Sequence, residues 1–143
     1  MTGYLLDENV LREFSLRGNA NVRKWLATVD DADLWLSVAT LFEKRRGVEL
    51  LKRRDPARAA SLLNAITNLE KVYVDRVIAV DADVVEEWTR MLGARNKDRW
   101  YLALVATARV HGLVLVTRNT RDFIGRGVRL LNPFEDPPLC LDP

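Results

Sequence analysis

Residues 102–123 read LALVATARVHGLVLVTRNTRDF, and this stretch carries the clearest structural pattern of the chain. Apolar residues on several faces predict a deeply buried helix from Asp98 to His111, which Gly112 ends. Residues 113–116 are all apolar, as is typical of a strand buried on both faces of a parallel sheet. The stretch therefore predicts a helix that leads into a central strand.

The same alternation of strands and helices extends in both directions. Four other apolar runs predict strands: 4–6, 34–36, 77–80 and 128–131. Helix starts are predicted at residues whose side chains cap helices well: Asn9, Asn21, Ser37, Asp55 and Asp81. Strands that alternate with helices predict an α/β fold, with a central, mostly parallel sheet of about five strands flanked by helices.

Size and composition favour one globular domain. The chain has 143 residues, of which 48% are apolar and 29% are charged. We place the domain at residues 1–134 and expect residues 135–143 to be a proline-rich, irregular surface tail. The lone cysteine, Cys140, cannot form an internal disulfide. A net charge of +2 is too small to indicate nucleic-acid binding by itself. Without a signal peptide or an apolar run of membrane-spanning length, we expect a cytoplasmic protein.

Four acidic residues stand at strand ends or helix starts, far apart in the sequence: Asp7, Glu43, Asp98 and Asp122. In parallel sheets, ligands bind beyond the carboxyl ends of the strands, where such residues can gather. Carboxylates gathered in one pocket repel one another unless a cation lies between them, and hard oxygen ligands suit Mg²⁺ or Mn²⁺. The pattern predicts a metal-dependent site able to hydrolyse phosphodiesters.

Each of these residues also has an ordinary structural interpretation. Asp7, Asp98 and Asp122 can cap helices, and Glu43 can be a solvated glutamate on a helix. The basic segment that follows Glu43, Lys44–Arg54, can be a solvated helix face or can contact phosphates. His111, at a predicted helix end, is more simply a partner of the helix dipole than a general base.

Three segments occur in the order found in a known family. They are YLLDENVL at 4–11, SVATLFEKRRGVELL at 37–51, and the stretch 102–123 followed by GVRLLNPF at 127–134. From Tyr4 to Phe134 the chain resembles PIN-domain ribonucleases, and more narrowly the VapC-type toxins of bacterial type II toxin–antitoxin pairs. The resemblance implies a PIN-like three-layer sandwich.

The resemblance also implies the roles of individual residues. In the family, acidic residues hold Mg²⁺ or Mn²⁺ and water attacks a phosphodiester of RNA. Asp7 is then the first metal ligand and Glu43 the second. Three residues, Thr117, Asn119 and Asp122, line the fourth corner of the metal site. The implied partners are RNA, a VapB-type antitoxin and a second copy of the chain.

Two positions depart from the family's pattern. Glu8 replaces a small hydroxyl residue, and Tyr101 stands where the third aspartate usually opens the helix. Asp98 lies three residues earlier, one turn along the same helical face, and is our candidate for the third metal ligand.

Two alternatives to a nuclease remain open at this point. Tyr101 favours a catalytically weakened PIN domain that acts as an RNA- or protein-binding module. A phosphate-accepting receiver domain also places acids at strand ends, but it needs a lysine after a late strand, and no lysine follows Gly112.

Overall fold

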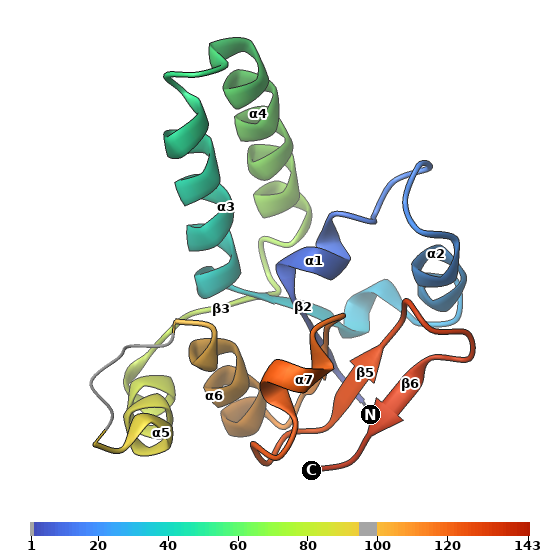
Figure 1. The fold of residues 1–143 in the computed structure, drawn as a ribbon, viewed down its shortest axis with the longest axis vertical. Helices are drawn as coiled ribbons and strands as arrows, with labels where there is room; N and C mark the ends of the chain where they lie inside the picture. Colours follow the sequence, from blue (N-terminus) through green and yellow to red (C-terminus); the bar gives the residue numbers. More distant parts are fainter. Residues whose placement is uncertain (1, 95–99) are drawn as a thin grey trace.

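The computed structural model describes residues 2–94 and 100–143, and the described residues form an α/β fold around one sheet (Figure 1). The strand order is β3-β2-β1-β4-β5-β6, and every neighbouring pair is parallel except β5 with β6. The strands are β1 (Tyr4–Leu6), β2 (Leu34–Ser37), β3 (Val77–Ile78), β4 (Val114–Val116), β5 (Leu130–Asn132) and β6 (Leu139–Leu141). The predicted fold class is confirmed, with a sixth strand.

Helices cover both faces of this sheet. They are α1 (Glu8–Leu11), α2 (Ala20–Leu26), α3 (Val38–Leu51), α4 (Pro56–Val72), α5 (Ala82–Leu92), α6 (Leu102–His111) and α7 (Thr120–Phe123), with a 3-10 turn at Asp31–Asp33. Leu5 packs with α6 and α7, whereas its neighbour Leu6 packs with α1 and α2. Because adjacent strand residues point to opposite faces, this division shows that β1 is buried on both sides.

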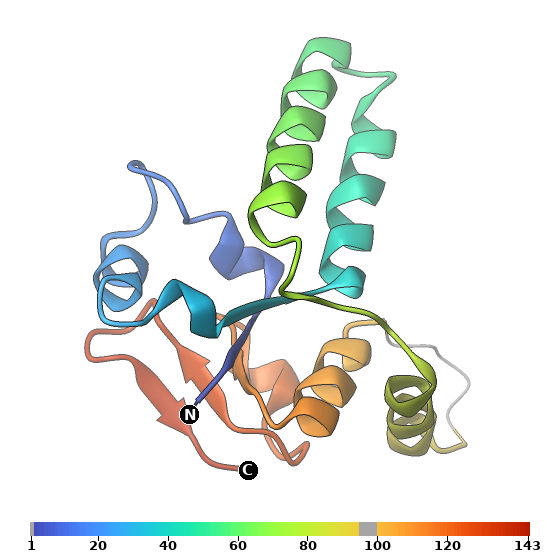
Figure 2. The same ribbon diagram turned by 180° about the vertical axis from the view of Figure 1, so that it is seen from behind.

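Helices α3 and α4 form a hairpin that projects from the rest of the molecule, as both views show (Figures 1 and 2). Only the first turns of α3 lie against the sheet, where Ala39 joins the core shared with α6. Farther along, Val48, Ala59 and Ile66 form a small separate cluster between the two helices. The hairpin is thus held mainly by its own contacts.

Several predicted element boundaries are confirmed. Ser37 caps α3, Asp55 caps α4 with Pro56 at its first position, and Asp81 caps α5. Gly112 ends α6 with a φ of 64°, in the left-handed region that glycine adopts without steric cost.

Other boundaries differ from the prediction. The cap of α1 is Asp7 rather than Asn9, because the Asn9 side chain instead bonds Asp7 and Thr117. Asn19, rather than Asn21, caps α2, and the Asn21 amide donates to the Phe134 carbonyl. These polar residues have long-range partners that the local sequence does not reveal.

The strands also differ from the prediction: β2 continues to Ser37 and β4 begins at Val114. β3 ends at Ile78, two residues earlier than predicted, and β5 begins at Leu130 and includes Asn132. The predicted irregular tail is wrong at residues 139–141, which pair with β5 as the antiparallel edge strand β6. Asp98, the predicted start of the buried helix, lies outside the described residues, and α6 as described begins at Leu102.

Within residues 2–94 and 100–143, every helix is too short or too polar to cross a membrane.

Candidate active site

Asp7 lies at the carboxyl end of β1, and its side chain is held by three hydrogen bonds. Its Oδ1 accepts from the Glu8 backbone N–H at 2.8 Å. Its Oδ2 accepts from Thr117 Oγ1 at 2.9 Å and from Asn9 Nδ2 at 3.2 Å. With the residue only 8% exposed, these bonds fix the carboxylate in one orientation.

Thr117 is brought to Asp7 by strand pairing. β1 and β4 are parallel neighbours with Leu6 opposite Val116, so the residues that follow these two strands meet at one sheet edge. Thr117 is fully buried, and its Oγ1 also accepts from the Asn119 backbone N–H at 3.0 Å. Two residues predicted from sequence, Thr117 and Asp7, are therefore in direct contact.

Asn9 is part of this group, although its sequence context predicts only a helix cap. Its Nδ2 donates to Asp7 and, at 3.4 Å, faces Thr117 Oγ1, while its Oδ1 accepts from the Arg118 backbone N–H at 3.1 Å. Asn9 thus links the end of β1 to the end of β4. Its position in the sequence could have indicated this role, because Asn9 lies two residues after an aspartate at a strand end. The short helix α1 directs its side chain back toward that strand end.

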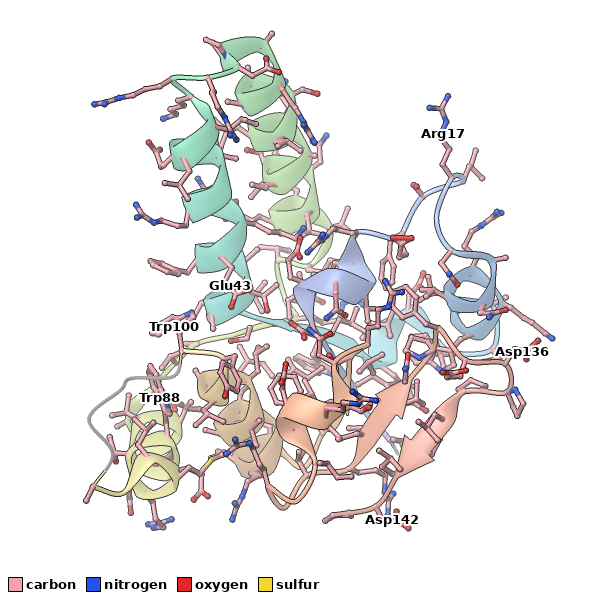
Figure 3. The ribbon with its side chains drawn as sticks, in the orientation of Figure 1. Arg17, Glu43, Trp88, Trp100, Asp136 and Asp142 are labelled. Carbon is pink, nitrogen blue, oxygen red and sulfur yellow. The ribbon has the colours of Figure 1, made fainter. Side chains whose placement is uncertain are left out.

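Glu43 enters from α3, about two turns after Ser37, on the side of the helix that faces α1 (Figure 3). Partial loss of solvation and then the negative charges of Asp7 and Glu8 raise the pKa of the Glu43 carboxyl. Burial, which outweighs the hydrogen bonds from Thr117, Glu8 and Asn9, raises the pKa of Asp7. The two predicted ligands therefore share one electrostatic environment that disfavours their negative charges.

Glu8 adds a third carboxylate to this environment. It bonds Arg12 and Lys44, so that α1 is linked to α3 by an ion pair between Glu8 Oε1 and Lys44 Nζ at 3.4 Å. From the sequence, Glu8 stands out only as a departure from the family's pattern, and Lys44 has no individual role.

The remaining predicted ligands are not brought to Asp7 by any interaction within the described ranges. Asp122 is exposed on α7, where its backbone N–H donates to the Asn119 carbonyl at 3.1 Å and its own carbonyl accepts from Arg126 Nε at 2.9 Å. Asn119 is exposed and joins the group through its backbone. Asp98 lies outside the described residues. The roles of Asp98, Asp122 and the Asn119 side chain stay predictions.

The donor set has the chemistry that a divalent cation requires. Asp7 and Glu43 supply hard carboxylate oxygens, and the pKa of each is raised, first by burial and then by neighbouring negative charge, so that a bound cation would stabilise the charged forms. Over residues 2–94 and 100–143, however, no three His, Cys, Asp or Glu side chains lie close enough to form a complete ligand set. The assignment of Asp7 and Glu43 as metal ligands therefore stays a prediction.

Comparison with known proteins supports this interpretation of the fold. Residues 4–126 match the PIN domain family. The chain is 30% identical over 142 residues to plasmid stability protein StbB of Pseudomonas syringae pv. tomato, which covers 92% of this chain and 98% of that protein. It is also 30% identical over 141 residues to toxin FitB of Neisseria gonorrhoeae, which covers 92% and 99% of the two chains.

Solved structures show the same likeness. A FitAB complex bound to an IR36 DNA fragment contains a chain that is 26% identical, with a TM-score of 0.77 over 92% of this chain and 96% of that chain. A DNA-bound VapBC complex from Salmonella typhimurium contains a chain with the same fold, at 20% identity and a TM-score of 0.66 over 91% and 97% of the two chains. The chain therefore belongs to the PIN domain family, and within that family it resembles the VapC-type toxins.

Proposed function

We propose that this protein is a metal-dependent endoribonuclease, the toxin of a type II toxin–antitoxin pair. The observation that carries the proposal is the buried Asp7 carboxylate at the end of β1, fixed by Thr117 and Asn9, whose negative charge helps to raise the pKa of Glu43 on α3. PIN-domain toxins are generally nucleases, which supports hydrolysis of a phosphodiester.

In the proposed reaction, Asp7 and Glu43 would hold Mg²⁺ or Mn²⁺, and Asp98 and Asp122 would complete the ligand set directly or through water. A bound divalent cation lowers the pKa of water and balances negative charge on the reacting phosphate. Thr117 and Asn9 keep Asp7 in the orientation that binding requires, and Asn119 lines the same corner. No side-chain nucleophile is needed.

We expect this chain to bind two protein partners, an antitoxin and a second copy of itself. Relatives have been solved as FitAB and VapBC complexes, which supports a VapB-type antitoxin as a partner of this chain. An antitoxin arginine or lysine that reaches the carboxylates would block the site by a charge-assisted hydrogen bond. We also propose a homodimer in the cytoplasm.

The decisive experiment measures RNA cleavage by the purified chain with Mg²⁺, with Mn²⁺ and with EDTA. We expect Asp7→Asn and Glu43→Gln each to lower the metal-dependent rate by about two to three orders of magnitude, because each removes a charge at the reacting centre. The control is Glu70→Gln, which removes a carboxylate paired with Arg45 on the projecting hairpin. Wild-type rates in the Asp7→Asn variant would reject the proposal.

One observation favours a second candidate, a catalytically weakened PIN domain that binds RNA or protein. Among the described residues the ligand set is incomplete, and Tyr101 occupies the place of the usual third aspartate. Calorimetric titration with Mn²⁺, run beside the cleavage assay, separates the two candidates. Metal binding that Asp7→Asn abolishes, without cleavage of single-stranded or structured RNA, would favour the binding module.

A further inference from the structure

Glu8 connects two short stretches that each contain a proposed metal ligand. It directly follows Asp7 in the sequence, and its partner Lys44 directly follows Glu43. Glu8 Oε2 accepts from Arg12 Nε at 2.7 Å and lies 2.6 Å from the second guanidinium nitrogen. Glu8 Oε1 lies 3.4 Å from Lys44 Nζ. Both oxygens of Glu8 are thus occupied by cationic side chains.

The engagement of both oxygens argues against Glu8 as a further metal ligand. A carboxylate whose two oxygens already contact cations would have to release one of them to bind a metal ion. Two guanidinium nitrogens of Arg12 contact Oε2 closely, so only Oε1 could bind a metal ion, and Lys44 already faces that oxygen. The glutamate at this position therefore acts on Lys44 rather than on the metal.

Lys44 is withdrawn from solvent but has unused hydrogen-bonding capacity. Its side chain is 17% exposed, against 67% for Arg12. An ammonium group has three N–H donors. Across the described part of the chain, its one ion pair or hydrogen bond is the 3.4 Å contact with Glu8. A shielded cation with donors to spare favours an anionic ligand, because burial strengthens the attraction and few waters compete.

We propose that Lys44, oriented by Glu8, binds a nonbridging phosphate oxygen of the RNA beside Asp7 and Glu43. This inference rests on the proposed function, since it assigns the substrate's phosphate to a place in that site. Lys44 is the phosphate-binding residue and Glu8 is the residue that positions it. Arg12 holds Glu8 from the solvent side.

The first test is RNA binding in EDTA, with a fluorescein-labelled single-stranded oligoribonucleotide and fluorescence anisotropy. We expect Lys44→Met to raise Kd about 5- to 10-fold and to reduce the slope of log K against log salt by about one phosphate contact. The matched control is Lys52→Met, because Lys52, like Lys44, pairs with a glutamate (Glu49, at 2.8 Å) but has a side chain that is 52% exposed. Equal affinities and slopes for the two variants would overturn the proposal.

The second test separates positioning from simple charge. Glu8→Gln keeps the shape of the side chain and frees Lys44, so we expect RNA to bind as tightly as before or more tightly. The cleavage rate kcat should fall about 10-fold, because a phosphate bound in a misaligned position reacts slowly. An unchanged kcat at saturating Mg²⁺ with a shifted Mg²⁺ midpoint would show that Glu8 is a metal ligand, and would overturn its assigned role.

These readouts remain informative if the proposed function is wrong. Binding in EDTA does not depend on cleavage. A wild-type chain that cuts no RNA would therefore reject the proposed nuclease activity, whereas the Lys44→Met binding measurement would still test the phosphate contact. Circular dichroism checks that each variant is folded. If Lys44→Met is not folded, Lys44→Gln provides the same neutral test with a polar side chain.

Discussion

The edge of the sheet at Asp7 and the projecting α3–α4 hairpin differ in what holds them in place. Around Asp7, the strand residues Leu6 and Val116 are fully buried, and polar side chains that follow them bond one another. The hairpin relies on a small cluster, Val48, Ala59 and Ile66, with Leu51 and Leu63 packed against it. Its surface leaves Leu50 63% exposed.

This difference indicates which part of the molecule can hold catalytic side chains in fixed positions. A carboxylate at the end of a buried central strand has little freedom, because neighbouring strands, a helix cap and a buried hydroxyl all constrain it. The hairpin contributes Glu43 and Lys44 from the first turns of α3, where Lys44 pairs with Glu8 of α1. The rest of the hairpin extends away from Glu43 (Figure 3). We therefore expect substitutions at the sheet edge to affect both stability and function, and substitutions far along the hairpin to affect stability less and function little.

The largest expected effect contrasts two core truncations. Leu115→Ala, in central strand β4, should lower the free energy of unfolding by about 4 kcal/mol, because the residue is fully buried and its neighbours cannot collapse into the cavity. Ile66→Ala, in the hairpin, should cost about 2 kcal/mol, because the small cluster around it can close up more easily. Urea unfolding measures both. A larger cost at Ile66 than at Leu115 would contradict the comparison.

The next effect concerns two threonine hydroxyls. Thr117→Val removes the donor to Asp7 Oδ2 while keeping the shape of the side chain, so we expect about a 10-fold loss of metal-dependent RNA cleavage and weaker Mn²⁺ binding. Thr67→Val removes a hydroxyl that donates to the Leu63 carbonyl on the hairpin surface. Cleavage should be unchanged in that control. Equal losses in the two variants would show that Thr117 acts only through stability.

The smallest effect is on stability as a function of pH. Burial raises the pKa of Asp7 above its ordinary value of 3.8, so the folded state binds this proton more tightly than the unfolded state. The resulting stabilisation is full below the unfolded pKa and is lost as pH rises through the folded pKa. Asp7→Asn abolishes this dependence and retains a side chain that caps helices. In EDTA, its melting temperature should exceed that of wild type at about pH 7 and approach it at about pH 4.

The control for this measurement is Glu70→Gln, which removes a partly exposed, ion-paired carboxylate from the hairpin. It should not show the gain at about pH 7 that Asp7→Asn shows, because exposed ion pairs contribute little to stability. A melting temperature for Asp7→Asn below that of wild type at every pH would contradict the destabilising effect of the buried charge.

Local patterns in the sequence determined most of the fold. The apolar run at 113–116 predicted a central buried strand, and Ser37, Asp55 and Gly112 marked helix boundaries that the structure confirms. These features depend on burial and on short-range backbone hydrogen bonds, which are properties of neighbouring residues. The order of motifs along the chain also predicted the PIN family.

Tertiary structure decided the partners of the polar side chains. Asp7 meets Thr117 because β1 pairs with β4, although they are separated by 110 positions in sequence. Lys44 meets Glu8 because α1 packs near α3. Residues 139–141 form a strand because β5 offers an open edge. Each outcome depends on which segments become neighbours in space, and a one-dimensional pattern does not contain the long-range packing energies that select those neighbours.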